Sequence, residues 1–138
     1  MGWTRLRLEL ARSHRHPDGS HRIAYEMTFP LDQNGRLDLV AFGDARELCT
    51  VHWFREDSDD RVGALHRRPG GNFVFAYGEP DPLEEQLPHL AEHRFMVGDY
   101  VSVTDPSGGQ HTFRVVSSVP APGLAPQPDA PRSAPTSV

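Results

Sequence analysis

Apolar and polar residues alternate in short runs along this chain, and turn-forming residues separate the runs. Two runs, LRLEL at 6–10 and IAYEMTF at 23–29, flank the turn signal PDGS at 17–20. A period of two residues is typical of a strand with one buried face, so a turn at Asp18-Gly19 predicts a hairpin whose strands share an apolar face. The expected pairs are His16 with His21, His14 with Ile23, Arg12 with Tyr25, Leu10 with Met27, and Leu8 with Phe29.

A second turn signal, Asn34-Gly35, follows within LDQNGRLDLVAF at 31–42. Both central positions of a two-residue hairpin turn favour positive φ, which Asn and Gly tolerate. We therefore expect the residues from 36 to 42 to form a third strand, with Val40 opposite Phe29.

Three further runs, at 47–56, 61–67 and 72–77, are separated by an acidic turn and by Pro69-Gly70. They predict a second three-stranded meander. Glu56 is expected opposite Arg61. The residues expected on the inward face are Val51, Trp53, Val62, Ala64, His66, Phe73, Phe75 and Tyr77.

The segment DPLEEQL at 81–87 has the signals of a helix start. Asp81 is placed as the cap, and Glu84 follows three residues later as its capping-box partner. This pattern predicts one short helix, which Pro88 ends.

A last hairpin joins GDYVSVT to QHTFRVV through DPSGG, where a type I turn and a glycine bulge set Val101 opposite Phe113. The runs add up to about eight strands. They predict an all-β fold, a small antiparallel barrel or sandwich built from successive hairpins. The proline- and alanine-rich end predicts a disordered tail over 120–138, which leaves a single β domain over 1–119.

Composition narrows the function classes. The fourteen basic residues are all arginine, and the formal net charge is −5, which disfavours general affinity for nucleic-acid backbones. No run approaches the roughly 18 apolar residues of a membrane span, and no secretory signal pattern opens the chain. The single cysteine, Cys49, cannot form an internal disulfide. We expect a cytoplasmic protein with neither a nucleic-acid partner nor membrane contact.

Three of the eight histidines, His14, His16 and His21, surround the first turn. In the expected register all three imidazoles point to one face, and such a group has the donors to bind zinc, copper or nickel. The turn is expected to be exposed, and no carboxylate is evidently placed to orient the rings. The leading interpretation is therefore solvated histidines, with no metal and no cofactor, and the trio remains the candidate metal site.

Arg15 and Arg22 are expected to face each other on the outer side of the same hairpin. Opposed like charges destabilise a strand pair unless an anion or acidic partner lies between them. The two are therefore candidates for contact with a phosphate or an acidic protein, and the alternative is that both extend into water. Arg12 is expected to stack on Tyr25 at the rim.

Other reactive side chains have simpler interpretations. Cys49 shares a face with Val51, which predicts a buried, inert thiol. His66 is expected to be a core or rim histidine. The acidic turn at 56–60 lacks the glycine and spaced glutamate of a calcium loop, and RRPGGN at 67–72 lacks the context of a phosphate-binding loop, so both are expected to be turns.

No group of residues in the sequence is specific enough to indicate a catalytic reaction. The leading hypothesis is a non-catalytic binding or interaction module, with a protein among its possible partners. The alternative is a metal-dependent, cupin-like β-barrel enzyme or metal-binding protein that uses the three histidines. A third hypothesis is nucleic-acid binding through outer-face arginines: Arg5, Arg7, Arg15 and Arg22.

Overall fold

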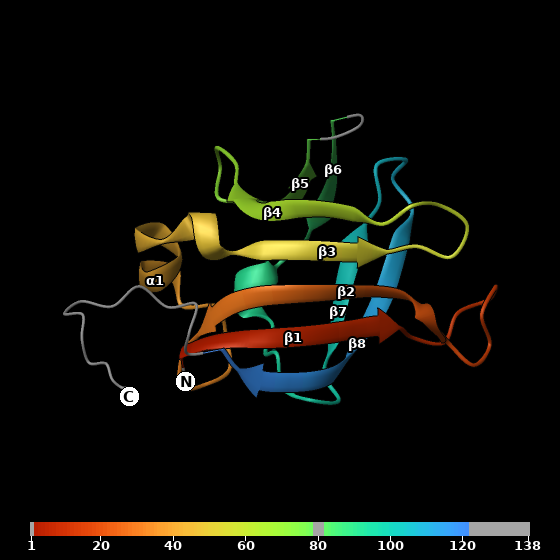
Figure 1. Cartoon of the computed structure of the whole chain (residues 1–138), viewed down its shortest axis with the longest axis horizontal. Coiled ribbons are helices and arrows are strands. Elements are labelled where there is room, and N and C mark those ends of the chain that lie inside the picture. The colour runs from red at the N-terminus through yellow and green to blue at the C-terminus, as the bar shows by residue number, and fades with distance from the viewer. Residues whose placement is uncertain (1, 79–81, 122–138) are drawn as a thin grey trace.

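A computed structural model describes residues 2–78 and 82–121 of the chain. Over these ranges eight antiparallel strands close into a barrel, in which each strand pairs with its chain neighbours and β8 pairs with β1 (Figure 1). The prediction of a small antiparallel barrel is confirmed; one short α-helix is present in these ranges, but at 39–44 and not at the predicted 81–87. The strands are β1 (Gly2–Leu10), β2 (Ser20–Leu31), β3 (Thr50–Phe54), β4 (Arg61–Arg67), β5 (Phe73–Tyr77), β6 (Leu83–Leu87), β7 (Tyr100–Thr104) and β8 (Gln110–Pro120).

The first hairpin forms, but its expected register is wrong. Leu8 lies opposite Tyr25, where the turn signal had placed Phe29, and Arg12 does not face Tyr25. The chain reverses through a long loop between Leu10 and Ser20, instead of at the expected Asp18-Gly19 turn, and within this loop Ser13 and His16 exchange backbone hydrogen bonds of 2.9 and 3.2 Å. The pairing is displaced by an even number of residues, so the same side chains still point inward.

The chain also reverses at Asn34-Gly35, where Gly35 has a φ of 80°. The expected two-residue turn is wrong, however, because Asn34 does not have positive φ and the Asp32 N–H donates to the Arg36 carbonyl at 2.8 Å, which leaves three residues in the turn. The expected third strand is wrong, because the chain makes only one bridge, between Leu31 and Leu37, before helix α1 (Leu39–Asp44) begins. Asp38 caps this helix by accepting a hydrogen bond from the backbone N–H of Ala41. A helix leaves Val40 in solvent and turns one aromatic residue, Phe42, into the core.

The hairpin of β3 and β4 also forms with an unexpected register. Its pairing is displaced by an odd number of residues, which changes the side chains that face the interior. Trp53, not Glu56, lies opposite Arg61. Odd displacement exchanges the two faces of β4, so Val62 is 64% exposed while Arg61 is 6% exposed, and the expected inward position of Val62 is wrong. The inward residues expected on β3 and β5 are confirmed, with Val51, Phe73, Phe75 and Tyr77 all buried.

The segment from Leu83 to Leu87 is strand β6, so the predicted helix is wrong. Five residues of β6 pair with β5, and Leu83, Glu85 and Leu87 alternate toward the interior. The proposed cap, Asp81, lies outside the described residues. Short 3₁₀ turns, η1 (Arg46–Leu48) and η2 (Leu90–Glu92), complete the helical elements of the described ranges.

The last hairpin forms with the expected pairing of Val101 with Phe113. β8 continues through Pro120, and the backbone N–H of Ala121 donates to the Trp3 carbonyl at 2.9 Å. The predicted tail thus begins inside a strand, and its remainder at 122–138 lies outside the described residues. None of the helices in the described ranges has the length and apolar character to span a membrane.

One end of the barrel is filled by apolar side chains; we call it the packed end. It lies beside α1 at the left of Figure 1. Phe42 from α1 packs edge-on against Phe73, and Phe95, which follows η2, packs edge-on against Phe29, each at a centroid distance of 5.6 Å. Leu37 and Leu90 are buried with them. Apolar packing at this end therefore holds the strands together. The buried polar groups described below lie at the opposite end.

Candidate binding site at the open end of the barrel

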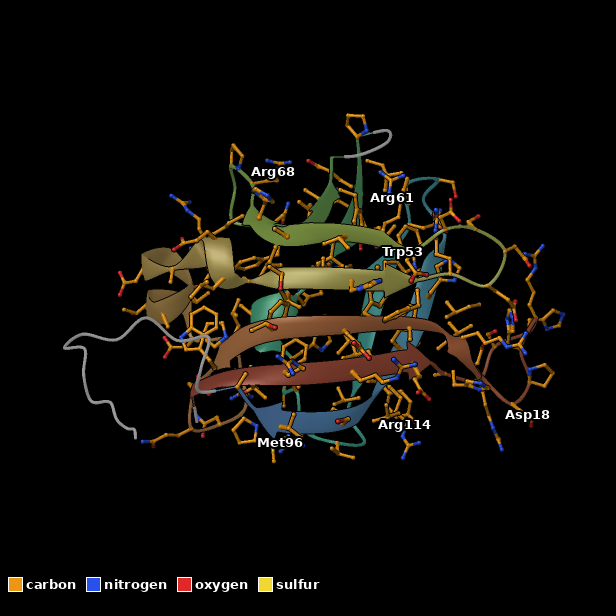
Figure 2. All side chains as sticks on the ribbon, viewed as in Figure 1. Asp18, Trp53, Arg61, Arg68, Met96 and Arg114 are labelled. Carbon is orange, nitrogen blue, oxygen red and sulfur yellow. The ribbon has the colours of Figure 1, made fainter. Side chains whose placement is uncertain are left out.

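The β1–β2, β3–β4 and β7–β8 loops project at the opposite end of the barrel (Figure 1). Residues of these loops and of the strands beneath them line a hollow of about 780 Å³, which we call the mouth. Figure 2 shows Trp53 toward this end of the barrel and Arg68 toward the other. The apolar lining consists of Leu10, Ile23, Tyr25, Trp53, Leu83, Pro106 and Phe113. The charged and histidine lining consists of His14, Arg15, His16, Arg55, Glu56, Asp57, Glu85, Asp105 and His111.

A carboxylate lies at the floor of the mouth. Glu85, on β6, is 1% exposed. The Tyr25 hydroxyl lies 2.9 and 2.8 Å from its two carboxylate oxygens, and the Tyr77 hydroxyl donates to Oε1 at 2.8 Å. The two tyrosines come from β2 and β5 and are themselves buried. Three strands therefore bring three polar groups together in a mainly apolar interior.

Burial dominates the electrostatics of this group. Loss of solvent raises the pKa of Glu85 to about 7, although the hydrogen bonds from Tyr25 and Tyr77 oppose the increase and the nearby Asp105 adds to it. The same loss of solvent, together with the Glu85 carboxylate, raises the pKa of both phenols above the ordinary value. The phenols thus remain proton donors while Glu85 changes charge near neutral pH.

The two phenols do not saturate the carboxylate. Each tyrosine has one proton to donate, so at most two of the roughly four acceptor positions of ionised Glu85 are filled by these phenols. A buried carboxylate with spare acceptor positions is costly unless another donor or cation approaches it. The floor of the mouth is therefore suited to a ligand that donates hydrogen bonds or carries positive charge.

Aromatic rings form one wall above the floor. Tyr25 stacks on Trp53 at a centroid distance of 6.0 Å, and it meets Phe113 edge-on at 4.8 Å. The guanidinium of Arg55 lies over the Trp53 ring, 4.9 Å from its centroid. Its N–H groups also donate to the Asp59 carbonyl at 2.9 and 2.7 Å. The wall thus combines apolar surface with a ring face that already holds a cation.

The rim carries two histidine–carboxylate pairs. His16 lies 3.4 Å from Glu56, and His111 lies 2.8 Å from Asp105. Asp105 also organises the β7–β8 loop: burial opposes its ionisation, but hydrogen bonds from Ser107, His111 and Gly109 lower its pKa to about 2. Asp105 is therefore a fixed negative charge beside the mouth at ordinary pH.

The expected histidine trio is divided between two hollows. His14 and His16 line the mouth, whereas His21 lines a separate polar hollow of about 660 Å³ beside Asp18 and Arg114. The expected pairing of His16 with His21 is wrong, because β1 and β2 are not paired at those positions. Across residues 2–78 and 82–121, no three His, Cys, Asp or Glu side chains are grouped to hold a metal ion.

The expected opposition of Arg15 and Arg22 is also wrong. Arg15 lies on the β1–β2 loop at the mouth. Arg22 is exposed on β2, in a stretch that is not paired with β1. The exposed Arg12 does not stack on Tyr25. The longer loop separates all of these residues from their expected partners.

Other candidates have structural roles. The prediction of a buried thiol is confirmed, since Cys49 is 0% exposed and burial raises its pKa to about 12. His66 is exposed, so the expected core position is wrong; it lies on the face of β4 that the register change turned outward. The acidic turn at 56–60 is exposed, as expected.

Sequence reasoning missed Glu85 and the tyrosine pair that binds it. Glu85 falls in the segment interpreted as a helix, where glutamate is unremarkable. The available signal was the alternation of Leu83, Glu85 and Leu87, which places a charged residue at an inward strand position. An acidic residue there is unusual because it requires buried partners.

No family model, curated protein or solved structure matches the chain.

Proposed function

We propose that this chain is a non-catalytic binding module, and that the mouth is its site for a small molecule. The observation that carries the proposal is the convergence of Glu85, Tyr25 and Tyr77 beneath an aromatic wall. Ligand pockets typically enclose about 300–1,000 Å³ and combine apolar lining with a few fixed polar groups. The mouth, with a volume of about 780 Å³, has these properties.

The hydrogen-bond geometry favours recognition. The phenols position Glu85 from two strands, and Tyr25 is held in turn by contacts with Trp53 and Phe113. Side chains fixed in this way can orient a ligand with little loss of conformational entropy on binding. The single, buried cysteine is compatible with a reducing compartment, and we propose the cytoplasm as the location.

The two alternative functions, a metal-dependent enzyme and a nucleic-acid-binding protein, have less support. A metal-dependent enzyme needs converging ligands, and the expected trio is divided between two hollows. A nucleic-acid interface needs a basic surface, but Arg7 is bound to Glu9 and Glu26 at 2.9 and 2.8 Å. A protein ligand that inserts a side chain into the mouth is a variant of the proposal.

Fragment binding followed by NMR tests the proposed function. The full chain, labelled with ¹⁵N, is titrated with neutral, cationic and anionic aromatic fragments. We expect the perturbed amides to cluster around Tyr25, Trp53 and Phe113, and Ile23→Trp to block the effect by filling the mouth. Val62→Trp, on the exposed outer face, is the matched control and should leave binding unchanged. Perturbations centred on the hollow beside Arg114, or scattered without saturation, would contradict the proposal.

A further inference from the structure

We propose that the mouth selects a ligand with a protonated amine on a small apolar body. This inference rests on the proposed function and specifies the chemistry of its ligand. Three features lead to it: the floor carboxylate, a second carboxylate that lines the same hollow, and the apolar lining around them.

The floor supplies the first attraction. An ammonium group entering the mouth donates to the spare acceptor positions of Glu85, or to the Tyr25 hydroxyl oxygen, whose own proton points to Glu85. Water is largely excluded here, since both side chains are 1% exposed. Attraction between opposite charges is much stronger at such a site than in bulk water.

The second carboxylate strengthens the preference. Asp105 lines the same hollow and contributes to raising the pKa of Glu85, which means that the two negative groups repel each other across the site. A cation bound between them relieves this repulsion. His111 partly offsets the charge of Asp105 through their 2.8 Å contact, and it acts more weakly on Glu85, which forms no ion pair with the described residues that line the mouth.

The wall directs the ammonium group to the floor. The Arg55 guanidinium already covers the Trp53 ring at 4.9 Å from its centroid, so a second positive group is repelled there and is better placed beside the Glu85 carboxylate. Ile23 on β2 and Leu83 on β6 are half-buried apolar lining residues, which suit the body of the ligand. The lining holds four carboxylates, two guanidinium groups and three imidazoles, so with neutral imidazoles and ionised carboxylates its net charge is negative and favours cations over anions.

Three aromatic probes of matched shape test the inference: 2-phenylethylamine, 2-phenylethanol and phenylacetate. Binding is followed by Trp53 fluorescence in the full chain carrying Trp3→Phe, because the chain has two tryptophans. We expect the amine to bind at least about tenfold more tightly than the alcohol, and phenylacetate to bind most weakly. Glu85→Gln should abolish the difference between amine and alcohol.

Glu47→Gln is the matched control. It also removes one carboxylate, but from the exposed η1 turn outside the mouth, so the preference for the amine should change less than about twofold. If Glu85→Gln does not fold, Asp105→Asn replaces it and should reduce the preference about threefold, because one of two nearby charges is removed.

The outcomes separate this inference from the proposed function. Equal binding of amine and alcohol, or an amine preference that survives Glu85→Gln, would overturn the inference and leave the mouth as a binding site. Absence of saturable binding by all three probes, together with no fragment-induced NMR changes in the mouth, would overturn both.

Discussion

The two ends of the barrel are built from opposite chemistry. At the packed end, Phe42, Phe73 and Phe95 fill the interior without a buried charge among them. At the mouth, Glu85 and two tyrosines occupy the corresponding interior positions, and loops leave a hollow above them. Burying a carboxylate lowers stability relative to an apolar residue. The comparison indicates that the packed end stabilises the fold, while the mouth gives up some stability for a recognition group.

Truncation at the packed end should have the largest effect. Phe95 is 0% exposed and packs against Phe29, so Phe95→Ala removes a buried ring and leaves a cavity. We expect a loss of about 3–5 kcal/mol in the free energy of unfolding, measured by urea denaturation. Fragment binding by the fraction that remains folded should be preserved. A loss below about 1 kcal/mol would mean that this end is not the stabilising one.

The polar floor of the mouth should instead make the free energy of unfolding depend on pH. The pKa of Glu85 is about 7 in the folded chain and 4.5 as its ordinary value, so the folded state holds its proton more tightly. Stability is then highest below pH 4.5 for this group and falls as the pH rises toward 7. The full decrease is about 3 kcal/mol as an order of magnitude.

Glu85→Gln tests this pH dependence. Glutamine can accept from one phenol and donate to the other without carrying charge. The variant should therefore lose the decrease between pH 5 and 8 and should be the more stable protein at pH 8, as measured by denaturation at several pH values. Parallel pH curves for the two proteins would show that Glu85 is not the group responsible.

A smaller loss of stability is expected from a substitution in the β1–β2 loop, which borders the mouth. Gly19 has a φ of +74°, and a Cβ at this position would lie 2.5 Å from the Leu10 carbonyl oxygen. Gly19→Ala should cost about 1–3 kcal/mol and alter amide exchange in the β1–β2 loop. Gly70→Ala is the control, because Gly70 has a φ of +92° but no atom lies within 4 Å of a Cβ added there. This substitution should lower the stability less. Equal losses of stability in the two variants would show that close approach to the Leu10 carbonyl is not the cause.

The fold could be predicted because alternation survives errors in loop length. A sequence shows which residues share one face of a strand, but it does not show where a long loop ends and pairing begins. For β1 and β2 the error was even, so Leu8 and Tyr25 still point inward. For β3 and β4 it was odd, so Arg61 replaced Val62 in the interior.

The candidate site was less predictable because it depends on contacts between distant strands. Tyr25 and Glu85 are 60 positions apart in the chain, and nothing local indicates that they meet. Local capping signals around Glu84 favoured a helix, whereas pairing with β5 selected a strand. The three histidines that had suggested a metal site do not converge: His14 and His16 line the mouth, and His21 lines a different hollow.

The central claim is that the mouth is built around a carboxylate kept out of water. A ¹³C NMR titration of the Glu85 side-chain carboxyl, assigned by its loss in Glu85→Gln, measures this directly. The account predicts a midpoint near pH 7. A midpoint close to the ordinary value of 4.5 would mean that solvent reaches the carboxylate freely, and it would contradict the account.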